Sequence, residues 1–168
     1  MKKYSVAFLG CFLALAMIFS YIESLIPFYF GVPGIKLGLA NVLIVAVLYI
    51  CGPLPAIIIS IARAILSGFM FGSLFSIAYS MAGAVLSFIC MLIVKRFKFN
   101  IYTVSIVGGV THNLGQILVA MLVVENYNLI FYFPLLMIAG IVTGLIIGVI
   151  SERVYSLIGP YYRKRIDK

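Results

Sequence analysis

The sequence predicts an all-α, multi-pass membrane protein with six transmembrane helices in a single domain, residues 1–168. Three observations predict this class. Of the 168 residues, 65% are hydrophobic and only 10% are charged, and the mean hydropathy is +1.25. A soluble domain needs more polar surface than this. The apolar residues also form runs long enough to cross a bilayer, and most basic residues lie between those runs.

Each predicted helix follows from an apolar run, because a bilayer core requires about 20 apolar residues per span. The second run is short, so it crosses the membrane only if residues of the preceding loop join it. Pro53 and Pro55 beside Gly52 predict a tight turn between the second and third spans. The six predicted spans are Tyr4–Ile26, Leu37–Ile50, Leu54–Met70, Leu74–Val94, Ile101–Val124 and Ile130–Ser151.

The positions of lysine and arginine predict that both termini are cytoplasmic. Basic residues concentrate on the inner side of membrane proteins. The formal charge of +8 therefore indicates orientation in a bilayer rather than binding of nucleic acid. We expect the protein in the bacterial cytoplasmic membrane. Ten of the twelve basic residues fall on the predicted inner side: Lys2, Lys3, Lys95, Arg96, Lys98, Arg153, Arg163, Lys164, Arg165 and Lys168.

Small residues recur every four positions in three predicted spans. Such stripes allow helix backbones to approach closely in lipid, where the hydrophobic effect does not drive association. They indicate either packing within the chain or a surface on which a partner docks. The stripes are Gly10 with Ala14; Ser60, Ala64, Gly68 and Gly72; and Gly140, Gly144 and Gly148.

Arg63 lies near the middle of the third predicted span, with Ser60 and Ser67 on the same helical face. A charge at this depth costs at least about 2.5–3.5 kcal/mol unless it faces a cavity or a partner. We expect Arg63 to anchor an anionic or polar ligand. The alternative is a structural arginine that is satisfied by backbone carbonyls or by Glu23. Glu23 itself either contacts the ligand, pairs with Arg63 or Lys36, or reaches the outer headgroups.

A second polar group interrupts the fifth predicted span. His112, Asn113 and Gln116 lie near its middle, and His112 is the only histidine of the chain. Their side chains supply hydrogen-bond donors and acceptors suited to a flat heteroaromatic or polar head group. We expect them to line the ligand site. The alternative is a cluster of interhelical hydrogen bonds, each worth about 0.6 kcal/mol on average.

The segment before the second span, "PFYFGVPGIKLGLAN" from Pro27 to Asn41, cannot form a continuous helix because of its prolines and glycines. Irregular backbone near a membrane is tolerated where it is buried or lines a cavity. We expect a lid over an outward-facing pocket, with Lys36 and Asn41 directed inward; the alternative is an interfacial aromatic anchor. The predicted gating residues are Pro27, Phe28, Tyr29, Phe30, Gly31, Pro33 and Gly34.

Several motifs of catalysis and metal binding do not occur in the sequence. It has no phosphate-binding loop of the GxxxxGK[ST] type and no serine–histidine–acid set. Asp167 is the only aspartate, so no aspartate cluster can hold magnesium on a diphosphate. The three cysteines have no CxxC spacing, and one histidine cannot complete a His-based zinc site. We therefore expect a protein that is not an enzyme and has no cofactor, metal site or catalytic residues.

Four stretches resemble the Gx transporter family, which is also described as heptaprenyl diphosphate synthase component I. They are "SYIESLIPF", "PGIKLGLAN", "GGVTHNLGQILVA" and "LLMIAGIVTGLIIG". The family is similar in architecture to the S components of energy-coupling factor (ECF) transporters, which bind vitamins and depend on a membrane coupling subunit and ATPase subunits. The resemblance implies a gate at Pro27–Lys36 and a docking face with Gly10 and Ala14. The usual AxxxA pattern is broken, because Cys11 follows Ala7 at this spacing.

The predicted function is therefore that of an S-component-like subunit that binds a small organic molecule such as a vitamin or a flavin. Flavin is suggested only because some members of the family are linked to flavin movement. Two alternatives remain: a non-catalytic membrane subunit of an isoprenoid (heptaprenyl diphosphate) synthase, and a self-sufficient secondary transporter. The latter usually needs an intramembrane carboxylate, and Glu23 is the sole candidate.

Overall fold

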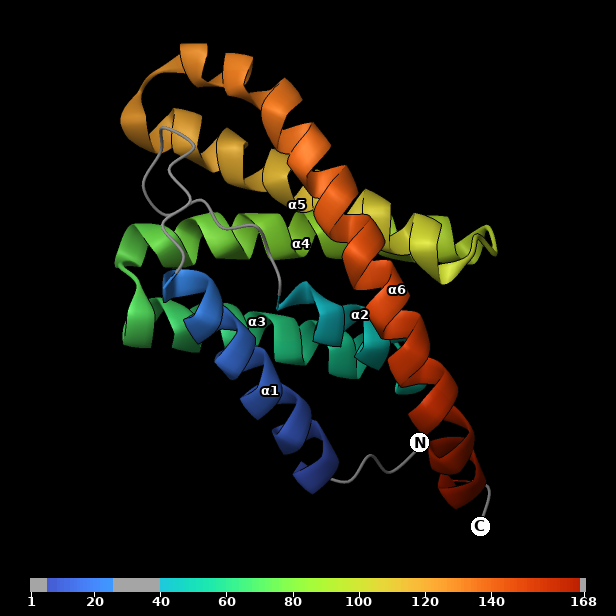
Figure 1. Cartoon of the computed structure of the whole chain (residues 1–168). Helices are drawn as coiled ribbons and strands as arrows, with labels where there is room; N and C mark the ends of the chain where they lie inside the picture. The colour runs from blue at the N-terminus through green and yellow to red at the C-terminus, as the bar shows by residue number, and fades with distance from the viewer. Residues whose placement is uncertain (1–5, 26–39, 167–168) are drawn as a thin grey trace.

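The computed structural model describes residues 6–25 and 40–166, which are helical apart from short turns (Figure 1). No strand occurs in these two ranges, so the all-α prediction is confirmed for them. The elements are α1 (Val6–Leu25), α2 (Asn41–Ile50), α3 (Pro53–Phe71), α4 (Leu74–Arg96), α5 (Ile101–Val124), the 3₁₀ helix η1 (Tyr127–Tyr132) and α6 (Phe133–Ile166).

Within the described ranges, five helical segments are long and apolar enough to cross a membrane: α1, α3, α4, α5 and the stretch from Tyr127 to Tyr162. The chain is thus a multi-pass membrane protein. The ten residues of α2 extend only about 15 Å, half of a hydrocarbon core of about 30 Å. A sixth span would need residues that precede Asn41, and residues 26–39 lie outside the described part. The sixth span and the sidedness of the termini therefore stay predictions.

Local sequence explains where the helices begin. Gly52 has a φ of 98°, a conformation that glycine adopts at little cost, and Pro53 follows at the first helical position, so the predicted tight turn is confirmed. At the start of α4, the Ser73 side chain accepts a hydrogen bond of 3.2 Å from the Ser76 N–H and so caps the helix. The Asn100 side chain caps α5 in the same way.

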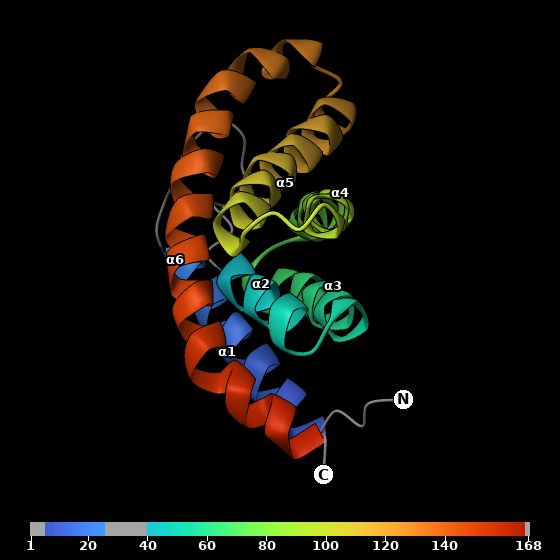
Figure 2. The same ribbon diagram turned by 90° about the vertical axis from the view of Figure 1, so that its right-hand side faces the viewer.

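Two pairs of helices pack most extensively, α4 with α5 and α5 with α6. α4 lies between α3 and α5, while α6 runs along α5 and continues past α2 (Figures 1 and 2). α1 packs mainly against α3. Its buried residues form one narrow stripe, Phe12, Ala16, Ser20 and Glu23, so most of its surface faces outward.

Helix α6 is longer than the span predicted to end at Ser151. It begins at Phe133 and continues to Ile166, with Pro160 inside it. Its 34 residues correspond to about 51 Å. Near its C-terminal end the ring of Tyr162 stacks on Phe8 of α1, with ring centroids 4.5 Å apart. The start of α1 and the end of α6 therefore lie at the same end of the molecule (Figure 2).

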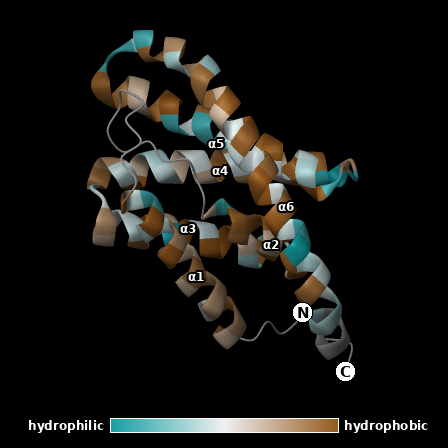
Figure 3. Ribbon diagram, in the orientation of Figure 1, coloured by the Kyte–Doolittle hydropathy of each residue, from teal (hydrophilic) through white to brown (hydrophobic). Residues whose placement is uncertain are grey.

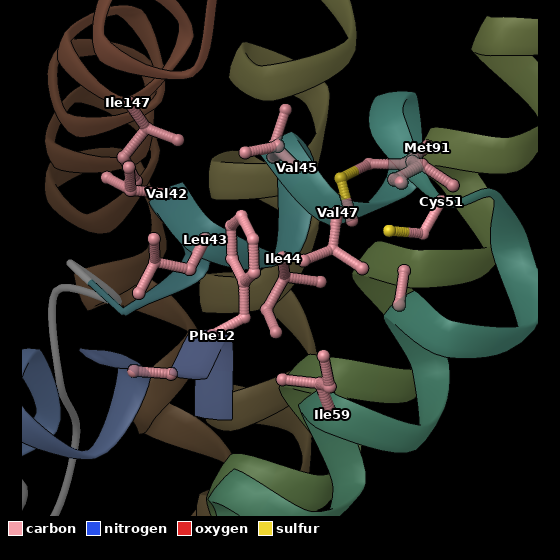
Figure 4. Packing of buried hydrophobic residues seen from close by; sticks show 14 of the residues in the cluster. Phe12, Val42, Leu43, Ile44, Val45, Val47, Cys51, Ile59, Met91 and Ile147 are labelled. Atoms are coloured by element: carbon pink, nitrogen blue, oxygen red, sulfur yellow. The ribbon is translucent and has the colours of Figure 1, made fainter. Parts of the chain in front are cut away.

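The main core surrounds α2, whose residues Val42–Leu48 are all buried. Side chains from the neighbouring helices close over it, including Phe12, Ile59 and Ile147 (Figure 4). Many large apolar side chains on the long helices remain exposed, and hydrophilic residues gather at the α4–α5 turn (Figure 3). This distribution suits a bilayer, where an apolar outer surface carries no cost.

The glycine stripe of α6 packs inside the molecule. A Cβ atom on Gly144 would lie 2.7 Å from the Cα of Ile106 in α5, and Gly140 faces the backbone of Gly109. These glycines let α5 and α6 meet at backbone distance. On α3, Gly68 packs against Ile77 of α4. For these two stripes, packing within the chain is the correct alternative.

Candidate functional site

Arg63 is the centre of a buried polar cluster between α1 and α3. Its side chain is only 2% exposed, and Ser60 and Ser67 on the same face of α3 are also buried. Its Nη1 atom donates a long hydrogen bond of 3.5 Å to the hydroxyl of Ser20 in α1. The carboxylate of Glu23, one turn further along α1, is buried and attracts the guanidinium electrostatically. The structure thus brings Glu23 and Arg63 together.

His112 of α5 approaches the same cluster from the side of α4. It lies within electrostatic range of Arg63 and is 2% exposed. Its ring packs against Gly83 of α4, where an added Cβ atom would lie 2.8 Å from the Nδ1 atom of the histidine. Any larger residue at Gly83 would collide with the imidazole. Sequence reasoning missed Gly83; the signal was its place in a stripe of small buried residues on α4 with Ser76, Ser80 and Ser87.

Several polar atoms of this cluster are buried and have no hydrogen-bond partner. They are Nε and Nη2 of Arg63 and Nδ1 of His112. Both amide atoms of Gln116, one helical turn from His112 on α5, are also buried without a partner. A buried polar atom without a partner costs about 1–3 kcal/mol, so native proteins contain few of them. A polar partner is therefore expected near Arg63 and His112.

Asn113 is oriented differently from its neighbours on α5. Its Nδ2 atom donates a hydrogen bond of 2.8 Å to the carbonyl oxygen of Leu136 in α6, while its Oδ1 atom is buried without a partner. The interhelical hydrogen bond that the sequence offered as an alternative is therefore present for Asn113. His112 and Gln116, one helical turn apart, share another face of α5.

The remaining predicted site residues are only partly described. Asn41 is half-buried at the first position of α2. Gly10 and Ala14 are exposed on α1, and a Cβ atom on Gly10 would meet nothing within 4 Å. Lys36 and the gating residues Pro27, Phe28, Tyr29, Phe30, Gly31, Pro33 and Gly34 lie outside the described residues.

A separate set of contacts fixes the C-terminal end of α2. The Nζ atom of Lys95 donates a hydrogen bond of 2.6 Å to the Leu48 carbonyl and lies 4.3 Å from the ring centroid of Tyr49. A cation at a helix C-terminus is favourable. Nearby, burial raises the pKa of the Cys51 thiol above its ordinary value, and the Tyr162 hydroxyl opposes the shift. These contacts stabilise α2 and do not involve Arg63.

The Arg63 cluster is suited to binding. It offers a cation and an imidazole in a buried environment, where hydrogen bonds are stronger than in water. In residues 6–25 and 40–166, no group of three His, Cys, Asp or Glu side chains could hold a metal ion. The cluster supplies recognition groups that can hold a polar part of a small molecule.

Comparison with known proteins gives one family. Residues 12–154 match the family model described as heptaprenyl diphosphate synthase component I. This match covers most of the chain and all of the Arg63 cluster. No curated protein matches the sequence, and no solved structure matches it.

Proposed function

We propose, on the premise that this chain belongs to the heptaprenyl diphosphate synthase component I family, that it is the substrate-binding membrane subunit of an ECF-type transporter. It binds a small organic molecule, such as a vitamin or a flavin, and a separate ATPase module drives its movement. The observation that carries this proposal is the buried Arg63, whose Nε and Nη2 donors have no partner, with the buried His112 within electrostatic range.

The depth of this cluster supports transport. Arg63 and His112 each lie near the middle of a helix long enough to cross the membrane. An ionisable residue at this depth commonly belongs to a substrate pathway. In this proposal Arg63 neutralises a negative group of the ligand, while His112 and Gln116 hydrogen-bond its polar head; Asn113, also expected there, instead donates to the Leu136 carbonyl. Lys36 and the segment from Pro27 to Gly34 act as the second cation and the gate.

The proposed partners are the bilayer, a membrane coupling subunit and ATPase subunits. The face of α1 that carries Gly10 and Ala14 is exposed, and the open space around Gly10 would admit a closely packed partner helix. The ATPases are separate proteins because this chain has no phosphate-binding loop. The proposal assigns no catalytic residue, and the protein is not an enzyme.

A second candidate function follows from the family description. The chain would be a non-catalytic membrane subunit of an isoprenoid synthase that holds a prenyl chain between its helices. The third alternative, ion-coupled secondary transport, requires a carboxylate that can exchange its ion. Glu23 is buried and attracted by Arg63, which disfavours that role.

Native mass spectrometry of the purified full-length protein tests the proposal directly. We expect a retained small molecule in the wild type, and its loss in R63Q. The control variant K98Q lies at the exposed α4–α5 turn and should retain the molecule. Co-expressed coupling and ATPase subunits should co-purify with the wild type.

Retention of no small molecule together with the absence of any complex with these subunits would contradict the transport proposal. The isoprenoid alternative has its own assay. It predicts that the activity or product length of a soluble prenyl synthase depends on this chain, and unchanged values on omission of the chain would eliminate it.

A further inference from the structure

We propose that Gly83 is a positioning residue of the ligand site: the absence of a side chain at this position seats the imidazole of His112 against α4 and so presents the ring to the ligand. This inference rests on the proposed function, since it takes His112 as a group that binds the small molecule. It is carried by the contact between Gly83 and the ring, the burial of the ring, and the backbone that surrounds both.

The contact between Gly83 and His112 is specific to one edge of the imidazole. A Cβ atom on Gly83 would lie 2.8 Å from both the Nδ1 and the Cε1 atoms of His112, and 2.9 Å from its carbonyl oxygen. The Nδ1–Cε1 edge of the ring therefore occupies the space that any side chain at position 83 would need. The Nε2 atom lies farther from this point than these three atoms, so it is the ring nitrogen that Gly83 covers less.

The burial of the His112 ring favours binding over packing alone. The side chain is 2% exposed. The backbone of Gly83 acts on the ring as a hydrogen-bonding group, yet Nδ1 forms no hydrogen bond of normal geometry. Burial of an incompletely satisfied polar atom is costly, so packing alone would favour an apolar side chain here. The imidazole is instead retained, within electrostatic range of Arg63.

The backbone beside the ring leaves it little freedom to move. A Cβ atom on Gly115, three residues after His112, would lie 2.7 Å from the Ala82 carbonyl oxygen and 2.9 Å from the Cα of Gly83. The helices α4 and α5 thus meet at backbone distance next to the imidazole. A side chain at position 83 must therefore displace the ring or separate the helices. A group that is already fixed in place loses less conformational freedom when a ligand binds.

Gly108 provides a matched control on the same pair of helices. A Cβ atom on Gly108 would lie 2.7 Å from the Sδ atom and 3.0 Å from the Cγ atom of Met91 in α4. The flexible thioether of Met91 can rotate away from an added methyl group. G108A therefore perturbs the contact between α4 and α5 without placing an atom against the imidazole.

Nuclear magnetic resonance of the full-length protein in detergent tests the contact, with histidine labelled with carbon-13 at Cε1. His112 is the only histidine of the chain, so protein purified without a histidine tag gives a single imidazole signal. We expect this signal to keep its chemical shift in G108A. In G83A it should move by more than its line width, because the added methyl group displaces the ring.

Native mass spectrometry of the same samples tests the effect on the ligand. We expect G83A to lower the occupancy of the retained small molecule by about two- to tenfold, the effect of one lost hydrogen bond. H112A should lower it to a similar extent, and G108A should retain the wild-type occupancy. G83A/H112A should bind no more weakly than H112A, because Gly83 acts through the ring and the two effects are then not additive.

The double variant also keeps the test decisive if G83A alone fails to fold. Without the imidazole the added methyl group loses its collision with the ring, so G83A/H112A should fold. An unmoved Cε1 signal in G83A, equal occupancy in G83A and G108A, a further loss of binding in the double variant, or failure of both G83A and the double variant to fold would overturn the inference.

The two proposals fail in different ways. Any of these four results would remove the positioning role of Gly83 and leave the molecule retained by the wild type, and with it the transport function, intact. A wild-type protein that retains no small molecule would refute the ligand site itself.

Discussion

Gly115 of α5 lies against the backbone of α4, and its replacement by alanine should force these two helices apart. A Cβ atom at this position would lie 2.7 Å from the Ala82 carbonyl oxygen and 2.9 Å from the Cα of Gly83. Ordinary van der Waals contact begins near 3.5 Å, so the helices would separate by roughly 0.5–1 Å. Backbone atoms cannot rotate away as a side chain can.

The magnitude follows from the contacts that this separation weakens. A gap of 0.5–1 Å forfeits about a quarter to a half of each atomic contact of about 0.1–0.2 kcal/mol, so roughly 40 atom pairs lose about 1–4 kcal/mol. Alanine also favours a helix over glycine by about 1 kcal/mol. G10A is the matched control, because a Cβ atom on Gly10 meets nothing within 4 Å and the variant gains only the helix preference.

Thermal unfolding of both variants in detergent, followed by far-UV circular dichroism, measures the difference. We expect G115A to unfold at a temperature lower than that of G10A by at least about 2–4 °C, the shift that corresponds to about 1 kcal/mol at this chain length. Equal stabilities of the two variants would refute the close approach of α4 and α5 at Gly115.

Three further predictions concern polar contacts. E23Q should destabilise the protein by about 3–5 kcal/mol, because it removes the negative partner of the buried Arg63; the double variant E23Q/R63Q should lose less than the sum of the single variants, and strict additivity in unfolding titrations would argue against the interaction. K95M should lower stability by about 1.5–3 kcal/mol, since it removes the charged hydrogen bond to the Leu48 carbonyl; a chemical denaturation curve unchanged from the wild type would contradict that role. Because burial raises the pKa of the Cys51 thiol and the thiolate is the reactive form, its labelling by a maleimide should stay slow until the pH exceeds the ordinary thiol value of about 8.5. Rapid labelling at neutral pH, detected by mass spectrometry, would show that Cys51 is not protected.

The polar residues of the fifth span illustrate how much of the candidate site can be predicted from the sequence. Three hydrogen-bonding side chains in an apolar helix identified His112, Asn113 and Gln116 as unusual. Sequence spacing could not show that their surroundings differ, because the residues that contact them come from other helices. In the structure Asn113 donates to Leu136 of α6, whereas His112 packs against Gly83 of α4. Gly83 was missed because a glycine within an apolar helix has no local mark that identifies its neighbour.

The end of α6 shows a similar limit of prediction from sequence. The span prediction stopped at Ser151 because hydrophobicity declines there, yet α6 continues to Ile166. Hydropathy indicates which residues lie in lipid. A helix can extend beyond the lipid where its side chains pack against another part of the chain. Here the stacking of Tyr162 on Phe8 provides one such contact. The sequence contains both rings but does not reveal their proximity.

The sequence by itself determined the membrane class, the apolar helices, the turn at Gly52 and the residues whose burial demands an explanation, because these depend on composition and on chain-local rules. Only the tertiary structure decided which buried groups meet. It placed Glu23 and Ser20 beside Arg63, and it left the Nε–Nη2 edge of that arginine without a partner. The physical reason is that burial and pairing depend on the relative positions of α1 and α3, which are fixed by side-chain packing between segments far apart in the chain.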